Sequence, residues 1–521
     1  MSTIADVERM SLREIIGQHL VCGFAKPELD DQFREAVRTH KIANVILFAH
    51  NIVSKEQLYA LTAEIQALVK AECGTTALIG VDQEGGMITR LSPDCTNVPG
   101  AMAIAASGKG ENAYEAGFLT ATELRALGVN VDFAPSVDVN SNPNNPVIGV
   151  RSYGDSAETV ISYSTRMIEG LQQGGVMATA KHFPGHGDTH LDTHVALPVV
   201  EGDRAHLDEH LAPFKAAIET GVQAVMSSHI LFPSLEREQL PATMSRAIIT
   251  GLLKEELGFR GLVFTDCLEM DAIARHYGTV EGCVAALAAG IDLACISHHV
   301  ELGVAAVEAV EAAIEAGRID LGELKASTAK ILDAKAMLES LERPPFSAVD
   351  SPAHRAANLR LHRESITLAH DVPFTLGDRP IFIGPRLFRT TNTAKGADES
   401  TFSRLMGEQF NAPYIICPDN PDEEEIDEIV RQAAGASSVV AATYNGHLNR
   451  GQIELVNRFA GGDVICIALR NPYDLALIDR RIRTIACYSF TPVMADVLAQ
   501  LLTGEFIAEG TLPITLGGLY A

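Results

Sequence analysis

Short apolar runs alternate with helical patterns along much of the chain. Eight of these runs have the length and apolar content of buried strands: HLVCGF, ANVILFA, ALIGVDQ, VDFAPSVDV, GVMATAKH, AVMSSH, GLVFTD and IDLACIS. Between them lie segments such as EAGFLTATELRALG, whose apolar residues follow helical spacing up to Gly128, a residue suited to a left-handed cap. Eight successive strand–helix units predict a (β/α)₈ barrel that closes near Leu341.

The pattern changes after Leu341. The prolines of ERPPFSAVDSP, residues 342–352, stop a helix and favour an extended crossing, so they indicate a linker. A segment with helical character, AHRAANLRLHRESITLAHD, follows, and five further strand-like runs come after it: PIFIGP, PYIIC, SSVVAAT, DVICIALR and RTIACY. We therefore predict a barrel domain over residues 1–345 and a smaller, doubly wound α/β domain over residues 346–521.

Composition restricts the partners and the compartment. The formal net charge of −26 opposes binding to a phosphate backbone or an anionic membrane, so nucleic acid is not an expected partner. The nine cysteines include no CxxC pair and mostly fall in apolar runs, which is typical of reduced core residues. The first residues lack a signal-like pattern and no segment is apolar enough to span a bilayer, which favours the cytoplasm. Composition does not indicate an oligomeric state.

One polar segment repeats histidine at every fourth position. KHFPGHGDTHLDTH, residues 181–194, contains His182, His186, His190 and His194. Such spacing would align imidazoles on a helix as metal ligands, but the proline and glycines of this segment oppose a helix. We therefore expect no metal here and interpret the segment as a strand that runs into a loop carrying chemistry, with a polar loop as the alternative.

Further polar residues are expected at the carboxyl ends of barrel strands, where barrel enzymes keep their catalytic groups. For Asp138 and His229 a structural role, as a cap or a hydrogen-bonded core residue, is the preferred interpretation. Asp266 differs, because it follows the apolar run GLVFT at the rim of the predicted barrel core. A carboxylate held there can attack the anomeric carbon of a sugar, although it could also cap the next helix.

Several motifs in order resemble one family over the whole chain. They are ANVILFAHNI, VDQEGGxxxR, IGxRSY, KHFPGHGxxxxDxH and PATMSRAIITGLLKEELGFRGLVFTD. Together they resemble the bacterial β-N-acetylhexosaminidases of glycoside hydrolase family 3, in the two-domain form. This sequence differs from the commonest form of these motifs at three positions, which are Gln83, Met87 and Val150.

The resemblance implies the roles of individual residues. It makes Asp266 the nucleophile of a retaining hydrolysis, and it makes Asp192 and His194 the acid/base pair. DTHLDTH holds two Asp-Thr-His triplets, and chemistry alone leaves Asp188 with His190 open. The sugar contacts implied by the resemblance are Asp82, Arg90, Arg151, Lys181 and His182, although either arginine could instead form a surface ion pair. The resemblance implies no cofactor.

A carboxylate beside an imidazole has a physical rationale of its own. It fixes the tautomer of the ring and favours its charged form, so the other ring nitrogen can donate and accept a proton near neutral pH. An imidazole would here replace the second carboxylate of the usual two-carboxylate scheme.

The predicted function is removal of terminal β-linked N-acetylglucosamine from small carbohydrates. The substrate would be cell-wall muropeptide fragments, as in peptidoglycan recycling, or chitooligosaccharides, and the sequence does not choose between them. A phosphorylase of the same family is the alternative, because a neutralisable imidazole lets phosphate approach with less repulsion. A β-glucosidase, a zinc-dependent barrel hydrolase and a ligand-binding role for the second domain are further alternatives.

Overall fold

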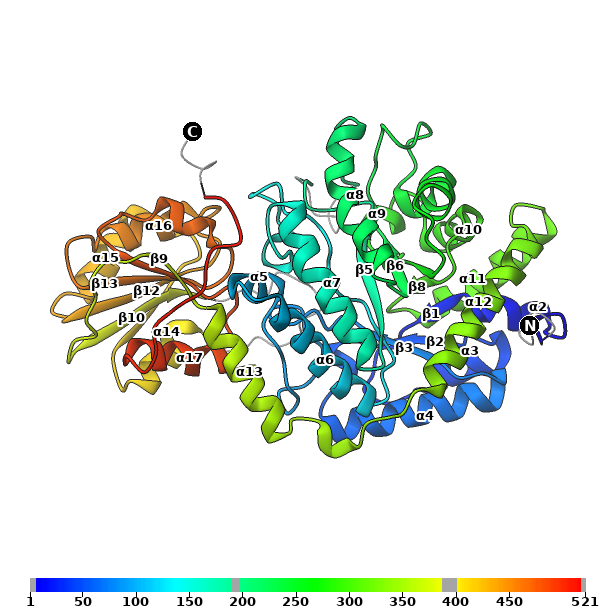
Figure 1. Ribbon diagram of the computed structural model, residues 1–521, viewed down its shortest axis with the longest axis horizontal. Helices are drawn as coiled ribbons and strands as arrows, with labels where there is room; N and C mark the ends of the chain where they lie inside the picture. Colours follow the sequence, from blue (N-terminus) through cyan, green and yellow to red (C-terminus); the bar gives the residue numbers. More distant parts are fainter. Residues whose placement is uncertain (1–5, 190–196, 387–400, 517–521) are drawn as a thin grey trace.

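Two sheets, each surrounded by helices, make up the protein (Figure 1). The structure is a computed structural model that describes residues 6–189, 197–386 and 401–516. An eight-stranded parallel sheet comes first in the chain and a six-stranded mixed sheet comes second. This arrangement confirms the predicted fold class of a barrel followed by a smaller α/β unit.

The first sheet curves into a barrel. Its strands are β1 (Leu20–Cys22), β2 (Asn44–Ile46), β3 (Leu78–Val81), β4 (Val131–Asp132), β5 (Met177–Phe183), β6 (Ala224–Ser227), β7 (Leu262–Thr265) and β8 (Ala294–Ile296). From β1 to β7, strands that are neighbours in the sequence pair in parallel, and β1 also pairs with β8. The barrel closes between β7 and β8, where the Thr265 N–H donates to the Leu293 carbonyl at 2.9 Å.

Helices surround the barrel, and local signals set their ends. They include α2 (Leu12–Gln18), α3 (Asp31–His40), α4 (Lys55–Cys73), α5 (Ala101–Ala106), α6 (Gly110–Ala126), α7 (Ala157–Gln173), α8 (Arg204–Glu219), α9 (Asp271–Ala274), α10 (Thr279–Ala289), α11 (Val300–Glu315) and α12 (Leu321–Ser340). In α4, the Ser54 side chain accepts from the Gln57 N–H, and Gly74 ends the helix in the left-handed conformation. Gly128 likewise has a φ of 87°, just beyond α6.

Apolar side chains fill the barrel interior. Phe133 and Phe264 lie at its centre, with ring centroids 5.3 Å apart in an edge-to-face arrangement. Val21, Leu78, Met177 and Leu262 belong to the same buried cluster. The interior is therefore packed with side chains and leaves no open channel among these residues.

The segment predicted to be a linker is docked on the barrel. The Arg343 guanidinium donates to the Ala126 carbonyl at 2.9 Å, and the Asp350 N–H donates to the buried Glu123 carboxylate at 2.9 Å. His354 also contacts Glu123, at 2.7 Å. The crossing thus runs along α6 toward α13 (Pro352–Ser365), as Figure 1 shows. The domain boundary at residue 345 stays a prediction.

The second sheet has helices on both faces, as expected of a doubly wound unit. Its strands are β9 (Thr367–His370), β10 (Pro380–Pro385), β11 (Tyr414–Cys417), β12 (Ser438–Thr443), β13 (Val464–Ala468) and β14 (Arg483–Ala486), in the order β11-β10-β12-β13-β14-β9. Successive residues of β13 face opposite cores: Ile465 and Ile467 contact one cluster, Val464 and Cys466 the other. One face packs on α14 (Phe402–Gln409) and α17 (Pro492–Leu502), the other on α15 (Glu423–Gln432) and α16 (Arg450–Asn457).

One expected helix is shorter than predicted. The helical segment over residues 353–371 ends at Ser365, and residues 367–370 form β9, which pairs antiparallel with β14. The β-branched Ile366 and Thr367 favour an extended chain, and pairing with the sheet satisfies their backbone groups. Within the described part of the chain, no helix combines the length and apolarity that crossing a membrane requires.

Candidate active site

A cavity of about 540 Å³ opens at the carboxyl ends of the barrel strands. All six of the predicted nucleophile and sugar-contact residues line it: Asp82, Arg90, Arg151, Lys181, His182 and Asp266. Asp82 directly follows β3, Lys181 and His182 belong to β5, and Asp266 directly follows β7. The predicted acid/base pair, Asp192 and His194, lies outside the described residues.

Asp82 is held by two cations in the cavity wall. The Lys181 ammonium donates to Asp82 Oδ1 at 2.9 Å, and the Arg90 guanidinium donates to Oδ2 at 3.3 Å. Burial opposes ionisation of the Asp82 carboxyl, but Lys181 and Arg90 outweigh it and lower its pKa. The Lys181 side chain is only 2% exposed, so this ion pair is shielded from solvent. The side chains of Arg90 and Arg151 are only 5% and 13% exposed, and each pairs with a carboxylate of the cavity wall, so neither forms a surface ion pair.

Glu84 is a member of this network that the sequence analysis missed. It accepts from Arg151 Nε at 2.9 Å and Nη2 at 2.7 Å, a two-point contact, and it lies 2.7 Å from the Lys181 ammonium. Burial opposes its ionisation, yet Arg151 and Lys181 lower its pKa. The sequence signal that could have identified Glu84 is its position, two residues after Asp82 in the polar turn beyond a buried strand.

Asp138 fixes the orientation of His182. Arg151 Nη2 lies 3.3 Å from His182 Nε2, and because a guanidinium only donates, Nε2 must accept. His182 Nδ1 therefore holds the proton and donates it to Asp138 Oδ2 at 2.7 Å. Asp138 also accepts from the His186 N–H at 2.7 Å. Asp138 is fully buried and makes the contacts of a structural residue, as expected. By holding His182, it nevertheless sets the orientation of a ring that lines the cavity.

Asp266 offers an ionised carboxylate to the cavity. Its Oδ1 accepts from the Cys267 N–H at 2.7 Å. Burial works against the charged form, but His229, His182, the Cys267 N–H and Lys181 together lower the Asp266 pKa. A carboxylate that is deprotonated at neutral pH and lies at the cavity wall has the charge state of a nucleophile.

His229 makes the contacts of a core residue. Its Nε2 donates to the Cys267 carbonyl at 2.9 Å, and its Nδ1 lies 2.9 Å from Thr243 Oγ1. Burial is the main reason that its pKa is lowered. Both ring nitrogens are therefore occupied, in agreement with the structural interpretation, and the ring supports the turn that presents Asp266.

Of the four regularly spaced histidines, the two that the structure describes, His182 and His186, do not share a helix. His182 lies in β5, and His186 lies in the loop beyond it. His186 Nδ1 contacts Thr189 Oγ1 at 2.9 Å, and burial is the largest cause that lowers the pKa of this ring to about 4. His186 is therefore neutral near pH 7 and lines the same cavity.

The outer part of the cavity carries aromatic rings and a carboxylate that the sequence analysis did not single out. Phe48 and His298 have ring centroids 4.8 Å apart. Glu269 accepts from the His298 N–H at 2.6 Å and contacts His299 Nδ1 at 2.5 Å. No sequence signal pointed to these residues, because they come from loops beyond three different strands.

Comparison with known proteins agrees with this geometry. Residues 11–334 match the model of the glycosyl hydrolase family 3 N terminal domain. Beta-hexosaminidase A of Pseudoalteromonas piscicida is 33% identical over 372 residues, which are 66% of this chain and 62% of that protein. The chain therefore spans less than two thirds of that relative.

Solved structures resemble the whole chain. A glycoside hydrolase family 3 β-N-acetylglucosaminidase from Paenibacillus sp. str. FPU-7 is 38% identical, with a TM-score of 0.89 over 97% of this chain and 99% of that chain. A β-glucoside phosphorylase has a TM-score of 0.81 at 21% identity, covering 99% of this chain and 97% of that chain. The second likeness shows the fold alone.

Proposed function

Because this chain belongs to glycoside hydrolase family 3, we propose that it is a retaining exo-β-N-acetylglucosaminidase. The observation that carries the proposal is that Asp266 and the five predicted sugar contacts, scattered over residues 82–266, line one cavity. A cluster of buried anionic and cationic side chains suits a neutral sugar, since its hydroxyls can both donate and accept hydrogen bonds.

In the proposed first step, an oxygen of the ionised Asp266 attacks the anomeric carbon. The bond to the glycosidic oxygen breaks while the imidazolium of His194 gives that oxygen a proton, so a neutral alcohol leaves and a glycosyl ester of Asp266 remains. Asp192 orients the ring and stabilises its charged form. Two steps of this kind retain the configuration at the anomeric carbon.

In the second step, water replaces the alcohol. The water attacks the same carbon while the neutral ring of His194 removes a proton from it, and the ester bond to Asp266 breaks. The products are free N-acetylglucosamine, the regenerated carboxylate of Asp266 and the imidazolium of His194. A phosphorylase would differ only here, with phosphate attacking in place of water.

The charged side chains of the cavity suggest how the enzyme would select the sugar at the end of a carbohydrate chain. Asp82, Lys181 and Arg90 are proposed to hold hydroxyls of one ring, with Arg151 and His182 beside them. If these groups bind the hydroxyls remote from the scissile bond, the ring must end its chain, which is why we propose exo action. Fixing the ring in this way also orients its anomeric carbon for attack.

Turnover of a chromogenic N-acetylglucosaminide, with and without phosphate, tests this proposal. We expect release of N-acetylglucosamine at a rate that phosphate does not change. Formation of sugar 1-phosphate only when phosphate is present would make the protein a phosphorylase. Comparing chitobiose with a disaccharide of N-acetylglucosamine and N-acetylmuramic acid would then separate the two proposed substrate classes. The cytoplasmic location stays a prediction.

A further inference from the structure

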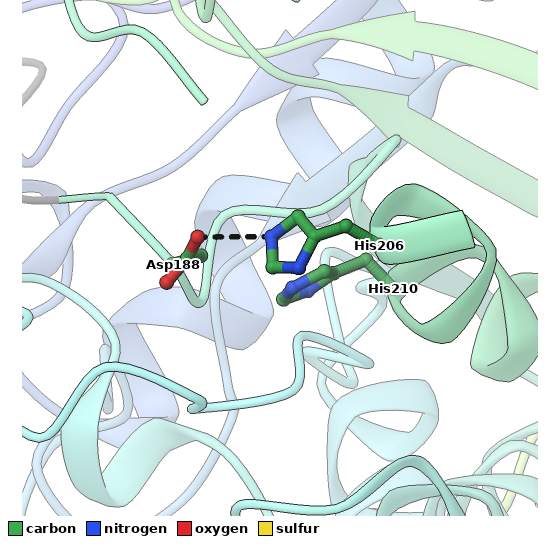
Figure 2. A group of neighbouring side chains, drawn as sticks. All are labelled: Asp188, His206 and His210. Atoms are coloured by element: carbon green, nitrogen blue, oxygen red, sulfur yellow. Dashed lines mark hydrogen bonds and ion pairs between the residues drawn. The ribbon is translucent and has the colours of Figure 1, made fainter. Parts of the chain in front are cut away.

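Three potential metal ligands meet outside the residues proposed for catalysis. His206 and His210 are four residues apart in α8, so both rings project from one face of this helix toward the segment after β5 that carries Asp188 (Figure 2). The ligand atoms of the three side chains all lie within 4.8 Å of one another. His206 Nε2 and Asp188 Oδ2 are 3.0 Å apart.

An ion pair between Asp188 and His206 would explain only part of this cluster. His210 is 3% exposed, and neither of its ring nitrogens has a hydrogen-bond partner among the residues that the structure describes. Burying an imidazole without a hydrogen-bond partner for either nitrogen costs free energy, because both nitrogens lose their contacts with water. A ligand held between the two histidines and Asp188 would supply the missing contact.

The surroundings keep His210 ready to bind a cation. His210 is buried beside His206, and their ring centroids are 5.1 Å apart, so the two imidazoles face the same small space. Gly185 makes the close approach possible, because a β-carbon there would lie 2.9 Å from His210 Cβ. The second oxygen of Asp188 accepts from Ser141 Oγ at 3.3 Å, the kind of outer contact that orients a ligating carboxylate.

We propose that Asp188, His206 and His210 bind one divalent transition-metal ion of the zinc type. Two imidazoles and a carboxylate suit zinc, whereas magnesium and calcium prefer oxygen ligands. Two ligands on a tetrahedral zinc ion lie about 3.3 Å apart, close to the separation of Asp188 and His206. Modest rotations of the side chains would complete the set, and a fourth position would be left for water.

The bound ion would tie the segment after β5 to α8. In the sequence, Asp188 lies four residues before Asp192, the proposed partner of the acid/base histidine. Its closeness to His206 also gives Asp188 a role other than the alternative pairing with His190. The sequence predicts no metal in this segment, because its proline and glycines oppose a helix that would align the histidines. Only the fold brings α8 beside Asp188.

Metal titration of the full chain tests the proposal without any sugar. After treatment with a chelator and dialysis, Zn²⁺ would be titrated against a chromogenic competitor, and Co²⁺ would be titrated for its visible absorption. We expect one Zn²⁺ per chain and a tetrahedral Co²⁺ spectrum. His206→Gln and Asp188→Asn should weaken binding by about 100-fold or more, because each removes a ligand. Mg²⁺ should not compete.

His276→Gln is the matched control, since His276 is exposed and lies outside the cluster. It should bind Zn²⁺ as the unmodified protein does. His206 and Asp188 are partly exposed, so their variants should unfold at the same urea concentration as the unmodified protein when metal is absent. If the unmodified chain binds no Zn²⁺ saturably, or if a Asp188→Asn/His206→Gln double variant still binds it, the site does not exist. Neither result depends on glycosidase activity, so this proposal and the proposed function can fail separately.

Discussion

The charged side chains of the cavity wall lie beside opposite charges that stabilise them. The buried Glu84 and the half-buried Asp82 lie beside Lys181, and Arg90 and Arg151 complete the network. Removing one member of a buried ion pair is costly, because the charge that remains is left poorly solvated. The proposed sugar contacts should therefore be sensitive to Glu84, even where this residue does not itself bind the substrate.

Glu84→Gln should raise KM by about 10-fold or more and lower the free energy of unfolding by about 3 kcal/mol. An amide oxygen could keep the contacts with Arg151 Nη2 and Lys181, but its NH₂ group would then face Arg151 Nε, and the negative charge that balances both cations would be lost. Steady-state kinetics and urea unfolding would measure both effects. Glu111→Gln is the control, because Glu111 forms an ion pair with Arg166 while 72% exposed, and it should change neither quantity measurably.

Asp266→Asn should leave sugar binding intact and lower kcat by about 10⁴-fold or more. The amide has nearly the shape of the carboxylate but cannot form the glycosyl ester. Binding of N-acetylglucosamine by calorimetry and turnover by freshly purified protein would be compared. Turnover at the rate of the unmodified protein, with deamidation excluded by mass spectrometry, would remove Asp266 from the mechanism.

His194→Ala should impair natural disaccharides far more than activated aryl substrates. A poor leaving group needs a proton as its bond breaks, whereas an activated phenolate does not. Deglycosylation should become limiting for aryl substrates because water lacks its base, and added azide should restore their turnover.

Two neighbouring variants separate the Asp-Thr-His triplets. Asp192→Ala should show a milder form of the same pattern, since the imidazole remains but loses its orienting carboxylate. His190→Ala should show no dependence on the leaving group. Azide rescue of His190→Ala and not of His194→Ala would instead assign the pair to Asp188 and His190.

At the scale of elements, the second sheet holds a turn of the barrel in place. The Asn471 side chain accepts from the Val150 N–H at 3.0 Å, and the Tyr473 hydroxyl accepts from Asn140 Nδ2 at 2.8 Å. Both come from the 3₁₀ turn around Pro472–Leu477, while Val150 adjoins the cavity residue Arg151. Gly149 has a φ of 46° and leaves no room for a β-carbon beside Asn471. Residues 471–473 therefore support the turn that carries Arg151, one of the proposed sugar contacts.

Tyr473→Phe should raise KM by about 10-fold while kcat changes little, because the lost hydrogen bond of about 1 kcal/mol loosens the turn that carries Arg151. Steady-state kinetics with the aryl substrate would measure this.

More generally, no acid, base or nucleophile is expected after Pro352. A natively folded variant of an Asp, Glu or His in that region that binds sugar but has no turnover would contradict this expectation.

At the scale of the whole molecule, buried neutral histidines occur in both parts of the fold. Burial is the largest cause that lowers the pKa of His19, His186 and His362 to about 4. His19 lies between α2 and β1 of the barrel, and His362 lies in α13. Their environments disfavour the charged ring, which the unfolded chain accepts freely below its ordinary pKa of 6.5.

The free energy of unfolding should therefore fall as the pH drops from about 6.5 to about 4, by up to about 3 kcal/mol for each of these histidines. Above this range the rings are neutral in both states and contribute no pH dependence. His362→Gln should reduce the slope, and His276→Gln should leave it unchanged. Urea unfolding at several pH values would measure the slope, and a stability that rises on acidification through this range would contradict the prediction.

The sequence by itself determined the order of elements and several residues of the candidate site. Periodic apolar residues predicted all eight barrel strands and five strands of the second sheet, because burial of one face or both leaves a repeating local signal. The motifs that resemble family 3 identified six of the residues that line the cavity. The roles of those residues, of Asp192 and of His194 stay predictions.

Only the tertiary structure decided which distant residues meet. Glu84 with Arg151, Asp138 with His182, and Asp188 with His206 and His210 are contacts between segments that carry no mutual periodicity. The same reason explains why residues 367–370 become an edge strand, since pairing with β14 overrides a helical local pattern. Local pattern sets which face of an element is buried, whereas the partner of a buried polar group depends on how the whole chain packs.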